Sequence, residues 1–220
     1  MIISSESLFK TIFPHCSGEQ YRRLSDYVKL LQVYGERLNL VSQSDLSRLW
    51  ENHVIPSIIA IPLIAFPFRA RVADLGSGGG LPAIPLKIMR PDLQMHMIES
   101  SRKKSAFLKK VVDEIGLQET WIHHMHLSLK NKDFKYYYSF EIVTVRAVAS
   151  MTRLIPLSKL LLKSGGFLLA WKGREDLEEL TNITNKQALE FQIIPIPHEY
   201  QKYSRKLHTL CLVKIKFITL

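Results

Sequence analysis

Apolar residues in the first third of the chain recur at helical intervals. Four of them lie three or four residues apart on one face of a helix: Tyr21, Leu24, Val28 and Leu31. Ser17 and Gln20 precede them in the spacing of a capping box, so we expect a helix to begin there. A second helix is expected to start at Ser44 or Asp45, with a further set turned inward: Leu46, Leu49, Trp50 and Val54. We therefore predict a helical extension over residues 1–66.

From Arg71 onward, short apolar runs alternate with helical stretches. Strands are expected at Val72–Leu75, Met95–Glu99, Thr120–His124, Ile142–Arg146, Phe167–Lys172 and Leu207–Lys216. Helices are expected at Ala83–Met89, Arg102–Ile115, Thr152–Leu162 and Glu175–Glu190. This alternation indicates an α/β fold with a mostly parallel sheet flanked by helices, in one compact unit over residues 67–220. No clear helix follows Phe191, so we expect the chain to end in an antiparallel strand or hairpin.

A glycine-rich segment follows the first predicted strand. The strand Val72–Leu75 leads directly into Gly76-Ser77-Gly78-Gly79-Gly80 and then Leu81-Pro82, and this proline suits the first turn of a helix. Ligands of open α/β sheets bind at the carboxyl ends of the strands, and glycines let a ligand approach the backbone closely. Glu99 ends the next predicted strand, where a carboxylate can accept both hydroxyls of a ribose. The segment therefore predicts a nucleotide-like ligand.

The acidic residue before the glycines separates two ligand classes. Asp74 would repel a pyrophosphate, whereas it would stabilise the cationic sulfonium and ammonium of S-adenosylmethionine. The third glycine also comes one residue earlier than in the dinucleotide pattern. In addition, Pro82 removes an N–H that phosphate binding would use. We interpret the segment as an S-adenosylmethionine site, with a dinucleotide site and a purely structural turn as alternatives.

Charge adds a second expectation. The net charge is +10, and most of the excess lies after residue 70. Such a balance favours a polyanionic partner, nucleic acid first, although a merely basic protein is the alternative. The predicted helix at 102–115 begins with several cations, which oppose the helix macrodipole: Arg102, Lys103, Lys104, Lys109 and Lys110. They form either a solvated face or an edge that contacts RNA phosphates.

Two further cations end neighbouring predicted strands. Arg146 follows an apolar run and Lys172 follows the next one, so we expect both to face a single cleft and to position an RNA phosphate or base. A structural salt bridge from such a cation to Asp74 or Glu99 is the alternative. His53 lies in the helical extension, where it is either functional or a buried histidine with its hydrogen bonds satisfied.

Composition excludes several classes of protein. Of the 220 residues, 46% are hydrophobic and 23% charged, as in an ordinary globular domain rather than a disordered chain. Cys16 and Cys211 match no disulfide, metal or redox spacing, so we expect a reducing compartment. The longest apolar stretch, Ile55–Phe68, contains three prolines and is too short to span a membrane. Glu6 lies where a signal peptide would be basic or apolar, so we expect a cytoplasmic protein.

A cluster of histidines lies near residue 124. His123, His124 and His126 have no cysteine or carboxylate partner at ligand spacing, so no metal is expected. Tyr136-Tyr137-Tyr138 follows in a basic segment, where it either stacks on bases or packs as a loop hinge.

Over about residues 30–216 the chain resembles the bacterial 16S ribosomal RNA guanine-N7 methyltransferases, also called glucose-inhibited division protein B. The resemblance rests on Val72–Leu86, Arg90-Pro91-Asp92, Glu99-Ser100, Arg102-Lys103-Lys104-x-x-Phe107-Leu108, Val145–Ala149 and Trp171-Lys172-Gly173. Asn39-Leu40, His53-x-x-x-Ser57 and the strand from Arg205 to Lys214 extend it. It implies a Rossmann-like, class I S-adenosylmethionine-dependent methyltransferase.

The implied reaction is methyl transfer to N7 of a guanine in 16S rRNA, guanine 527 of the 530 loop in reference rRNA numbering, with 16S rRNA or the 30S subunit as partner. N7 carries a lone pair and no proton, so the reaction needs positioning and no general base. Arg146 and Lys172 are the expected catalytic residues. The expected cofactor-binding residues are Asp74, Gly76, Ser77, Gly78, Leu81, Glu99, His126, Leu127 and Arg146. The expected RNA-binding residues are Arg102, Lys103, Lys104, Lys109 and His53.

The chain departs from the family pattern at three places. Ala83 replaces a glycine, Pro56 replaces an aspartate, and His124-Met125-His126-Leu127-Ser128 replaces the family's G-R-x-E-E. Two alternatives follow from the residues. One is a catalytically weakened relative that still binds cofactor or RNA. The other is a nicotinamide-dependent oxidoreductase.

Overall fold

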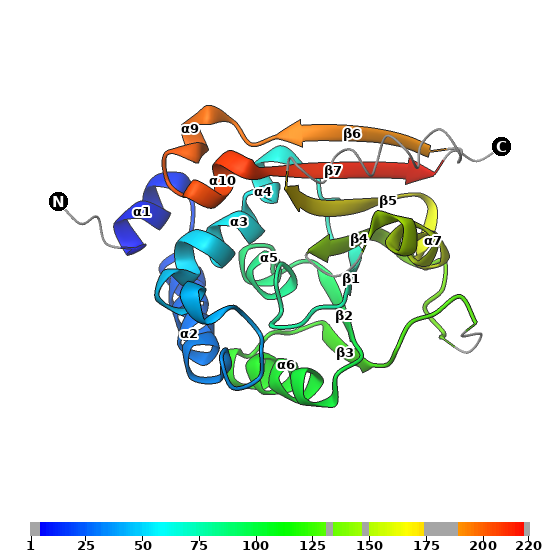
Figure 1. Ribbon diagram of the computed structural model, residues 1–220, viewed down its shortest axis with the longest axis horizontal. Coiled ribbons are helices and arrows are strands. Elements are labelled where there is room, and N and C mark those ends of the chain that lie inside the picture. The colour runs from blue at the N-terminus through cyan, green and yellow to red at the C-terminus, as the bar shows by residue number, and fades with distance from the viewer. Residues whose placement is uncertain (1–4, 131–133, 147–149, 174–188, 218–220) are drawn as a thin grey trace.

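The computed structural model describes residues 5–130, 134–146, 150–173 and 189–217. These residues include a seven-stranded sheet in the order β3-β2-β1-β4-β5-β7-β6 (Figure 1). Its strands are β1 Arg71–Leu75, β2 Gln94–Glu99, β3 Thr120–His124, β4 Phe140–Arg146, β5 Leu162–Gly173, β6 Leu189–Pro195 and β7 Leu210–Phe217. β1 to β5 pair in parallel, whereas β7 runs antiparallel to β5 and β6 runs antiparallel to β7. The predicted mostly parallel sheet is confirmed.

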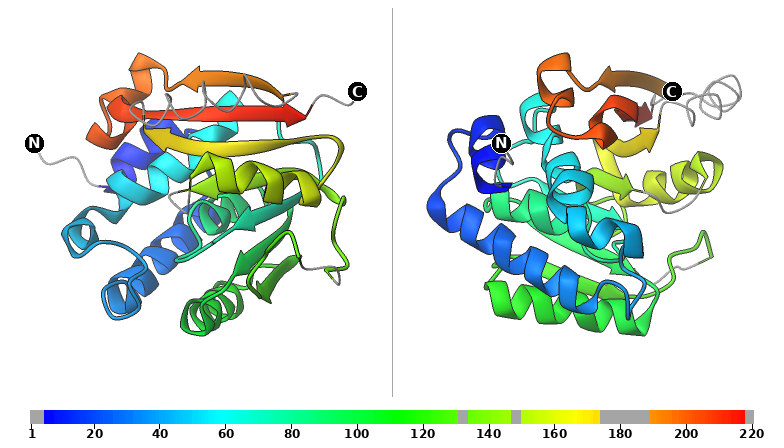
Figure 2. Two further views of the ribbon diagram at one scale, coloured as in Figure 1. Left: turned by 45° about the vertical axis from the view of Figure 1, so that its right-hand side comes forward. Right: turned by 60° about the vertical axis from the view of Figure 1, so that its left-hand side comes forward.

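Helices cover both faces of this sheet (Figure 2). The N-terminal segment contains α1 Ser5–Ile12, α2 Gly18–Tyr34, the 3₁₀ helix η1 Gln43–Arg48, the π-helical turn η2 Trp50–Val54, α3 Ile55–Ile58 and α4 Ala60–Leu63. The later helices are α5 Ala83–Met89, α6 Arg102–Ile115, α7 Met151–Leu161, α9 His198–Gln201 and α10 Arg205–Thr209. Among the described helices, none is both long and apolar enough to cross a membrane.

Two layers of buried side chains hold these elements together. One layer joins α2, α3, α5 and α6 to one face of the sheet, through residues such as Leu31, Ile58 and Phe107. The other joins α7 to the opposite face, through residues such as Leu154 and Val143. The carboxyl ends of β4 and β5 point toward the cyan segment that holds η2 and α3 (Figure 1). The N-terminal helices therefore close the end of the sheet at which a ligand is expected.

Most predicted helix bounds agree with the structure. The capping box of Ser17 and Gln20 is confirmed, with the Gln20 N–H donating to Ser17 Oγ and the Ser17 N–H to Gln20 Oε1. Helices α5 and α6 have the predicted limits. The second predicted helix is instead 3₁₀ and then π-helical before α3 begins, although Leu49 and Val54 are buried as expected.

Two predictions near the C-terminus are wrong. The segment 207–209 belongs to α10 rather than to a strand, because Ser204 Oγ caps that helix by accepting from the Lys206 N–H. Leu189 and Glu190 belong to β6 rather than to a helix, because they pair with β7. The rest of the helix predicted at Glu175–Glu190 lies outside the described residues. The predicted antiparallel ending is confirmed by β6 and β7, and short helices that the pattern did not show lie between them.

Candidate cofactor and RNA site

The glycine loop between β1 and α5 has left-handed backbone at several positions. Gly78 has φ +55°, and a Cβ there would meet only Gly76 O, at 3.8 Å. Gly80 has φ +90°, and a Cβ there would collide with the side chain of Ile84. Gly78 therefore leaves open space toward a ligand, whereas Gly80 allows α5 to pack close to the loop.

Glu99 ties this loop to the start of α6. Its Oε2 accepts from the Gly78 N–H at 2.8 Å, and its Oε1 accepts from the Ser101 N–H at 2.7 Å. Each carboxylate oxygen can accept a further hydrogen bond. Glu99 can therefore hold the loop and still receive the hydroxyls of a ribose.

Asp74 lies beneath the loop and is 1% exposed. Its Oδ1 accepts from Thr144 Oγ1 at 2.7 Å, and its Oδ2 is buried without a hydrogen-bond partner among the described residues. Burial raises the pKa of this carboxyl to about 6, although the hydrogen bond from Thr144 and the nearby hydroxyl of Ser77, which donates to the Asp74 backbone carbonyl, oppose the shift. Asp74 is not among the residues that line the cavities described below, so it would act on a cofactor through its charge rather than through direct contact.

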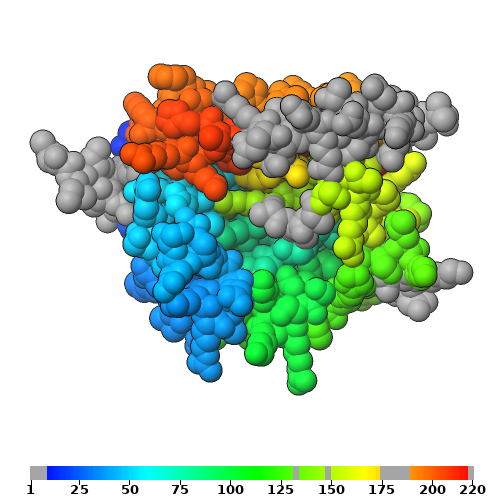
Figure 3. All heavy atoms as spheres, viewed as in Figure 1, coloured from blue at the N-terminus to red at the C-terminus, as the bar shows by residue number. Residues whose placement is uncertain are grey.

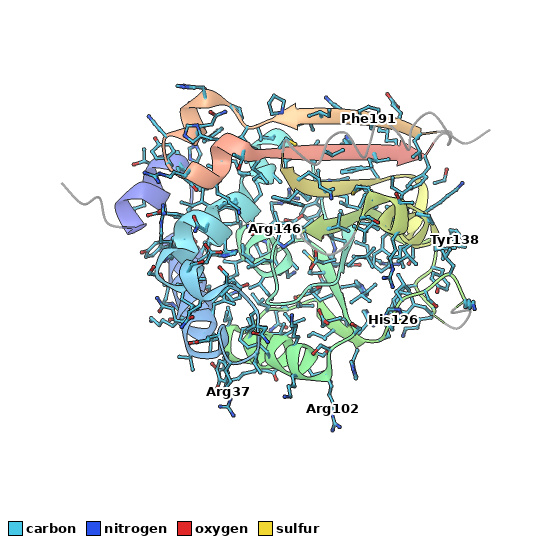
Figure 4. All side chains as sticks on the ribbon, viewed as in Figure 1. Arg37, Arg102, His126, Tyr138, Arg146 and Phe191 are labelled. Carbon is cyan, nitrogen blue, oxygen red and sulfur yellow. The ribbon has the colours of Figure 1, made fainter. Side chains whose placement is uncertain are left out.

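Arg146 ends β4 and reaches into the N-terminal helical segment (Figure 4). Its Nη1 donates to His53 O at 3.0 Å and to Ser57 Oγ at 2.8 Å, and its Nη2 donates to Asn52 O at 2.8 Å. The alternative that Arg146 forms a salt bridge to Asp74 or Glu99 is wrong. Two of its acceptors are carbonyls of the η2 turn, where a π-helix departs from the ordinary hydrogen-bond ladder. Burial lowers the pKa of Arg146 to about 10, so it remains a cation at neutral pH.

A cavity of about 510 Å³, here called the loop cavity, opens beside the glycine loop. It is lined by Gly76, Ser77, Gly78, Gly79, Leu81, Glu99, Ser100, Asn39, Leu40, His53, Lys104, Arg146 and Lys206. Most of the predicted cofactor-binding residues therefore meet here, together with two of the predicted RNA-binding residues. The cavity lies between the glycine loop, the N-terminal helical segment and the start of α6.

A smaller cavity of about 210 Å³, here called the side cavity, shares Gly76 and Ser100 with the loop cavity. Its other lining residues are Leu75, Ile98, Met125, His126, Leu127, Arg153, Leu154 and Leu157. These mostly apolar walls suit an adenine ring. His126 and Leu127 thus line a cavity at the expected end of the sheet even though the segment departs from the family pattern.

His53 lies on the wall of the loop cavity, with 15% of its side chain exposed. Its Nε2 lies 3.1 Å from Asp45 Oδ2. Burial and the nearby Arg146 cation lower the pKa of His53 to about 4, so the ring is neutral at neutral pH. It is therefore a polar group of the cavity wall and a poor phosphate anchor.

Lys172 does not lie beside Arg146. In the pairing of β4 with β5, Arg146 stands opposite Trp171, so these two side chains share a face of the sheet. Trp171 is buried and donates from Nε1 to Pro56 O at 2.6 Å. Lys172 points to the opposite face because side chains alternate along a strand. The expectation that both cations face one cleft is wrong.

The predicted RNA-binding cations of α6 do not all lie at the same site. Lys104 lines the loop cavity, whereas Arg102, Lys103 and Lys109 are exposed on the helix surface. Arg102 extends away from the body of the molecule (Figure 4). Only Lys104 of this group lines the loop cavity.

Three residues that the sequence analysis did not single out support this site. Tyr27 is fully buried, and its hydroxyl donates to Gly79 O at 2.7 Å. Its spacing from Leu24 and Leu31 could have identified it as inward-facing, and a buried tyrosine needs a partner. Thr144 binds Asp74, and Lys206 of α10 lines the loop cavity. No signal in the sequence beyond charge pointed to Lys206.

The tyrosine run belongs partly to the core. Tyr136 packs edge-on to His96, with ring centres 4.6 Å apart, and contacts Phe140. Tyr138 is 64% exposed. Of the two expectations for this run, packing rather than base stacking describes Tyr136, whose ring contacts residues of β2 and β4.

The fold and the site define a class I S-adenosylmethionine-dependent methyltransferase. The structure is similar to an S-adenosyl-L-methionine-dependent methyltransferase from Methanococcus maripaludis, with a TM-score of 0.60 and 13% identity, covering 88% of this chain and 93% of that one. It is also similar to a SAM-dependent methyltransferase from Aquifex aeolicus, with a TM-score of 0.56 and 12% identity, covering 77% of this chain and 91% of that one. At these identities the likeness shows the fold.

Sequence comparison shows the family. The model of GidB, rRNA small subunit methyltransferase G, matches residues 20–207, so the chain belongs to this family. A ribosomal RNA small subunit methyltransferase G of Clostridium beijerinckii is 36% identical over 169 residues, which cover 77% of this chain and 71% of the relative. The one from Sorangium cellulosum is 38% identical over 159 residues, covering 72% and 66%. The chain is a methyltransferase and its cofactor is S-adenosylmethionine, so the nicotinamide alternative is wrong.

Proposed function

We propose that this protein transfers the methyl group of S-adenosylmethionine to N7 of a guanine in 16S rRNA, the base implied being guanine 527 of the 530 loop. One observation carries the proposal. The loop cavity joins the cofactor loop to three cations, Lys104, Arg146 and Lys206. The single carboxylate among its lining residues, Glu99, already accepts two backbone hydrogen bonds. This cavity suits an anionic substrate whose reacting atom needs no base.

The residues present fit the cofactor. Gly78 offers open space at the position of a Cβ, and Glu99 retains acceptor capacity for a ribose. The side cavity, with Leu127 and His126 on its wall, can receive the adenine. When bound, S-adenosylmethionine supplies an electrophilic methyl group on a sulfonium. The glycine loop and Glu99 would hold the donor in a fixed orientation, and the buried carboxylate of Asp74 would supply a negative charge near the loop.

Arg146 is the residue best placed to orient the guanine. A guanidinium has five N–H donors, and three hydrogen bonds to described residues are formed here. A remaining N–H can donate to O6, an atom that arginine commonly recognises together with N7. If the arginine contacts O6 alone, the N7 lone pair stays free to attack the methyl group. No proton has to leave N7, so the lowered pKa of His53 does not hinder the reaction.

The departures in sequence left a catalytically weakened relative as an alternative, because the G-R-x-E-E pattern is replaced. The replaced segment nevertheless keeps its place. The Met125 N–H donates to Glu99 O at 3.1 Å, and His126 and Leu127 line the side cavity. These contacts support cofactor binding through the backbone and side chains present.

Methyl transfer from radiolabelled S-adenosylmethionine to unmodified 30S subunits and to naked 16S rRNA tests the proposal. We expect label in small-subunit RNA and none in 50S subunits. Cofactor binding without transfer to either substrate would instead support the catalytically weakened relative.

A further inference from the structure

A second pocket lies between the end of α2 and the start of α6, outside the loop cavity. It has a volume of about 470 Å³ and is here called the α2–α6 pocket. Tyr34 and Arg37 line it from the end of α2 and the turn that follows, and Lys103, Phe107 and Lys110 line it from α6. The space-filling view shows a notch in the lower outline between the blue and green segments that carry these residues (Figure 3).

The inner part of this pocket is aromatic. Phe107 is 3% exposed, and its ring centre lies 5.8 Å from that of Tyr34 at an interplanar angle of 54°. Tyr34 is half-buried and lines the pocket. Lys110 Nζ lies 5.7 Å from the centre of the same ring and pairs with Glu114. The pocket therefore contains two aromatic rings and a lysine whose ammonium lies over one of them, Tyr34.

The rim of the pocket is basic. Arg37 and Lys103 are exposed, and neither forms an ion pair with any residue in the described part of the chain. Arg37 extends outward from the body of the molecule (Figure 4). The lining includes no acidic residue. Unpaired cations above an aromatic surface match a nucleotide, whose base stacks while its phosphate meets the positive charge.

We propose that the α2–α6 pocket binds a single-stranded nucleotide of the RNA substrate, away from the methylated base. The proposal rests on the proposed function. Lys103 lines this pocket and the next residue, Lys104, lines the loop cavity, so the two sites lie on either side of one turn of α6. One RNA strand can therefore place a base on Tyr34, its phosphate on Arg37 and Lys103, and its target guanine in the loop cavity.

Three single variants test the pocket: Tyr34→Leu, Arg37→Gln and the control Arg22→Gln. Arg22 is an exposed arginine three turns before Tyr34 on α2, where it pairs with Asp26 at 3.6 Å instead of lining the pocket. The measurement is the affinity for unmethylated 30S subunits over a series of salt concentrations, with S-adenosylhomocysteine saturating the cofactor site. Tyr34→Leu should lower affinity roughly 5- to 150-fold with an unchanged salt slope, through loss of stacking. Arg37→Gln should reduce the slope by roughly 0.7, and Arg22→Gln should leave it unchanged.

Tyr34→Phe keeps the ring and should restore affinity, which separates stacking from a defect in folding. If the wild-type protein binds RNA and all variants have equal affinities and salt slopes, the pocket does not bind the RNA. The proposed function would be unaffected by that result. A wild-type protein with no affinity for 30S subunits would contradict the proposed function itself. Titration with AMP tests whether the pocket is instead a site for a free nucleotide. Micromolar AMP binding that Tyr34→Leu abolishes, with RNA affinity unchanged, would also overturn the proposal.

Discussion

At the residue scale, Asp74 combines burial with an incomplete set of hydrogen bonds. The pKa of its carboxyl is about 6, so it loses its charge in a mildly acidic solution. The affinity for S-adenosylmethionine should therefore fall as the pH drops from 8 to 5, because protonation removes a negative charge that would favour a cationic sulfonium in the loop cavity. S-adenosylhomocysteine has no sulfonium and should show a weaker dependence. Calorimetry with both ligands checks this, and identical pH profiles would contradict the role of Asp74.

The raised pKa of Asp74 also predicts how the free energy of unfolding changes with pH. A native pKa of about 6 exceeds the ordinary value of 3.8, so the native state holds this proton more tightly than the unfolded state does. Asp74 therefore contributes stability at low pH that is lost as the pH rises from about 4 to about 6. Relative to wild type, Asp74→Asn should gain up to about 3 kcal/mol of unfolding free energy between pH 4 and pH 7. Denaturant unfolding of the unliganded proteins measures this difference, and a constant offset would contradict it.

His53 changes the folding stability with pH in the direction opposite to Asp74, so the effect of Asp74 must be measured in a variant that changes Asp74 alone. Its lowered pKa of about 4 contributes stability above pH 6.5 that is lost as the pH falls toward 4. In the wild-type protein the two contributions partly cancel over the same range.

Gly78 and Gly80 should respond differently to the same substitution. Gly78→Ala places a methyl group in open space, so it should cost only about 1–2 kcal/mol of backbone strain while reducing cofactor affinity at least tenfold. Gly80→Ala collides with Ile84 at φ +90° and should lower the melting temperature markedly. Melting curves with calorimetry on the folded fraction distinguish the two. Normal cofactor affinity in Gly78→Ala would remove this glycine from the site.

The residues of the site were predictable to different degrees. Gly78 and Glu99 were predicted because their spacing along adjacent β–α units is local and specific, and both line the loop cavity. Asp74 was predicted to bind the cofactor, whereas it lines neither cavity. The position of Lys206 was not predictable, because α10 is held near the cavity by long-range contacts, including those with η2. Lys172 was misplaced because the phase of the strand, which decides the face of each side chain, is set by pairing with β4.

At the element scale, the π-helical turn η2 and strand β4 are joined by Arg146. Arg146→Ala should slow methyl transfer roughly 10- to 150-fold while changing cofactor affinity little, because the arginine is expected to contact the guanine. Ser57→Ala removes one of its acceptors and should give a smaller loss. Single-turnover rates at saturating cofactor measure both effects. Cofactor affinity that falls in parallel with the rate in Arg146→Ala would indicate a structural role instead.

The elements themselves show why sequence patterns succeed or fail. Helices α5 and α6 were predicted to the residue because a glycine loop and the Ser101 cap fix their beginnings locally. The η1 and η2 turns were not, since carbonyls of η2 accept from Arg146, more than ninety positions away in the chain. Long-range hydrogen bonds of this kind leave no periodic pattern.

At the scale of the whole molecule, the N-terminal helices and the sheet build one site together. Tyr27 of α2 holds the glycine loop, η2 holds Arg146, and the end of α2 forms the α2–α6 pocket with α6. Lys104, Lys103 and Arg37, three of the 30 basic residues, line the loop cavity or the α2–α6 pocket, where the proposed RNA strand would run.

Identification of the methylated nucleoside tests whether the protein methylates N7 of a guanine in 16S rRNA. Unmodified 30S subunits are incubated with the protein and labelled S-adenosylmethionine, and the 16S rRNA is then digested to nucleosides and separately mapped by chain scission at 7-methylguanine. We expect all label in 7-methylguanosine and scission at a single guanine, in the 530 loop. Replacing that guanine by 7-deazaguanine should abolish transfer, because the accepting nitrogen is gone. Label in any other nucleoside, or transfer that persists with 7-deazaguanine, would contradict the account.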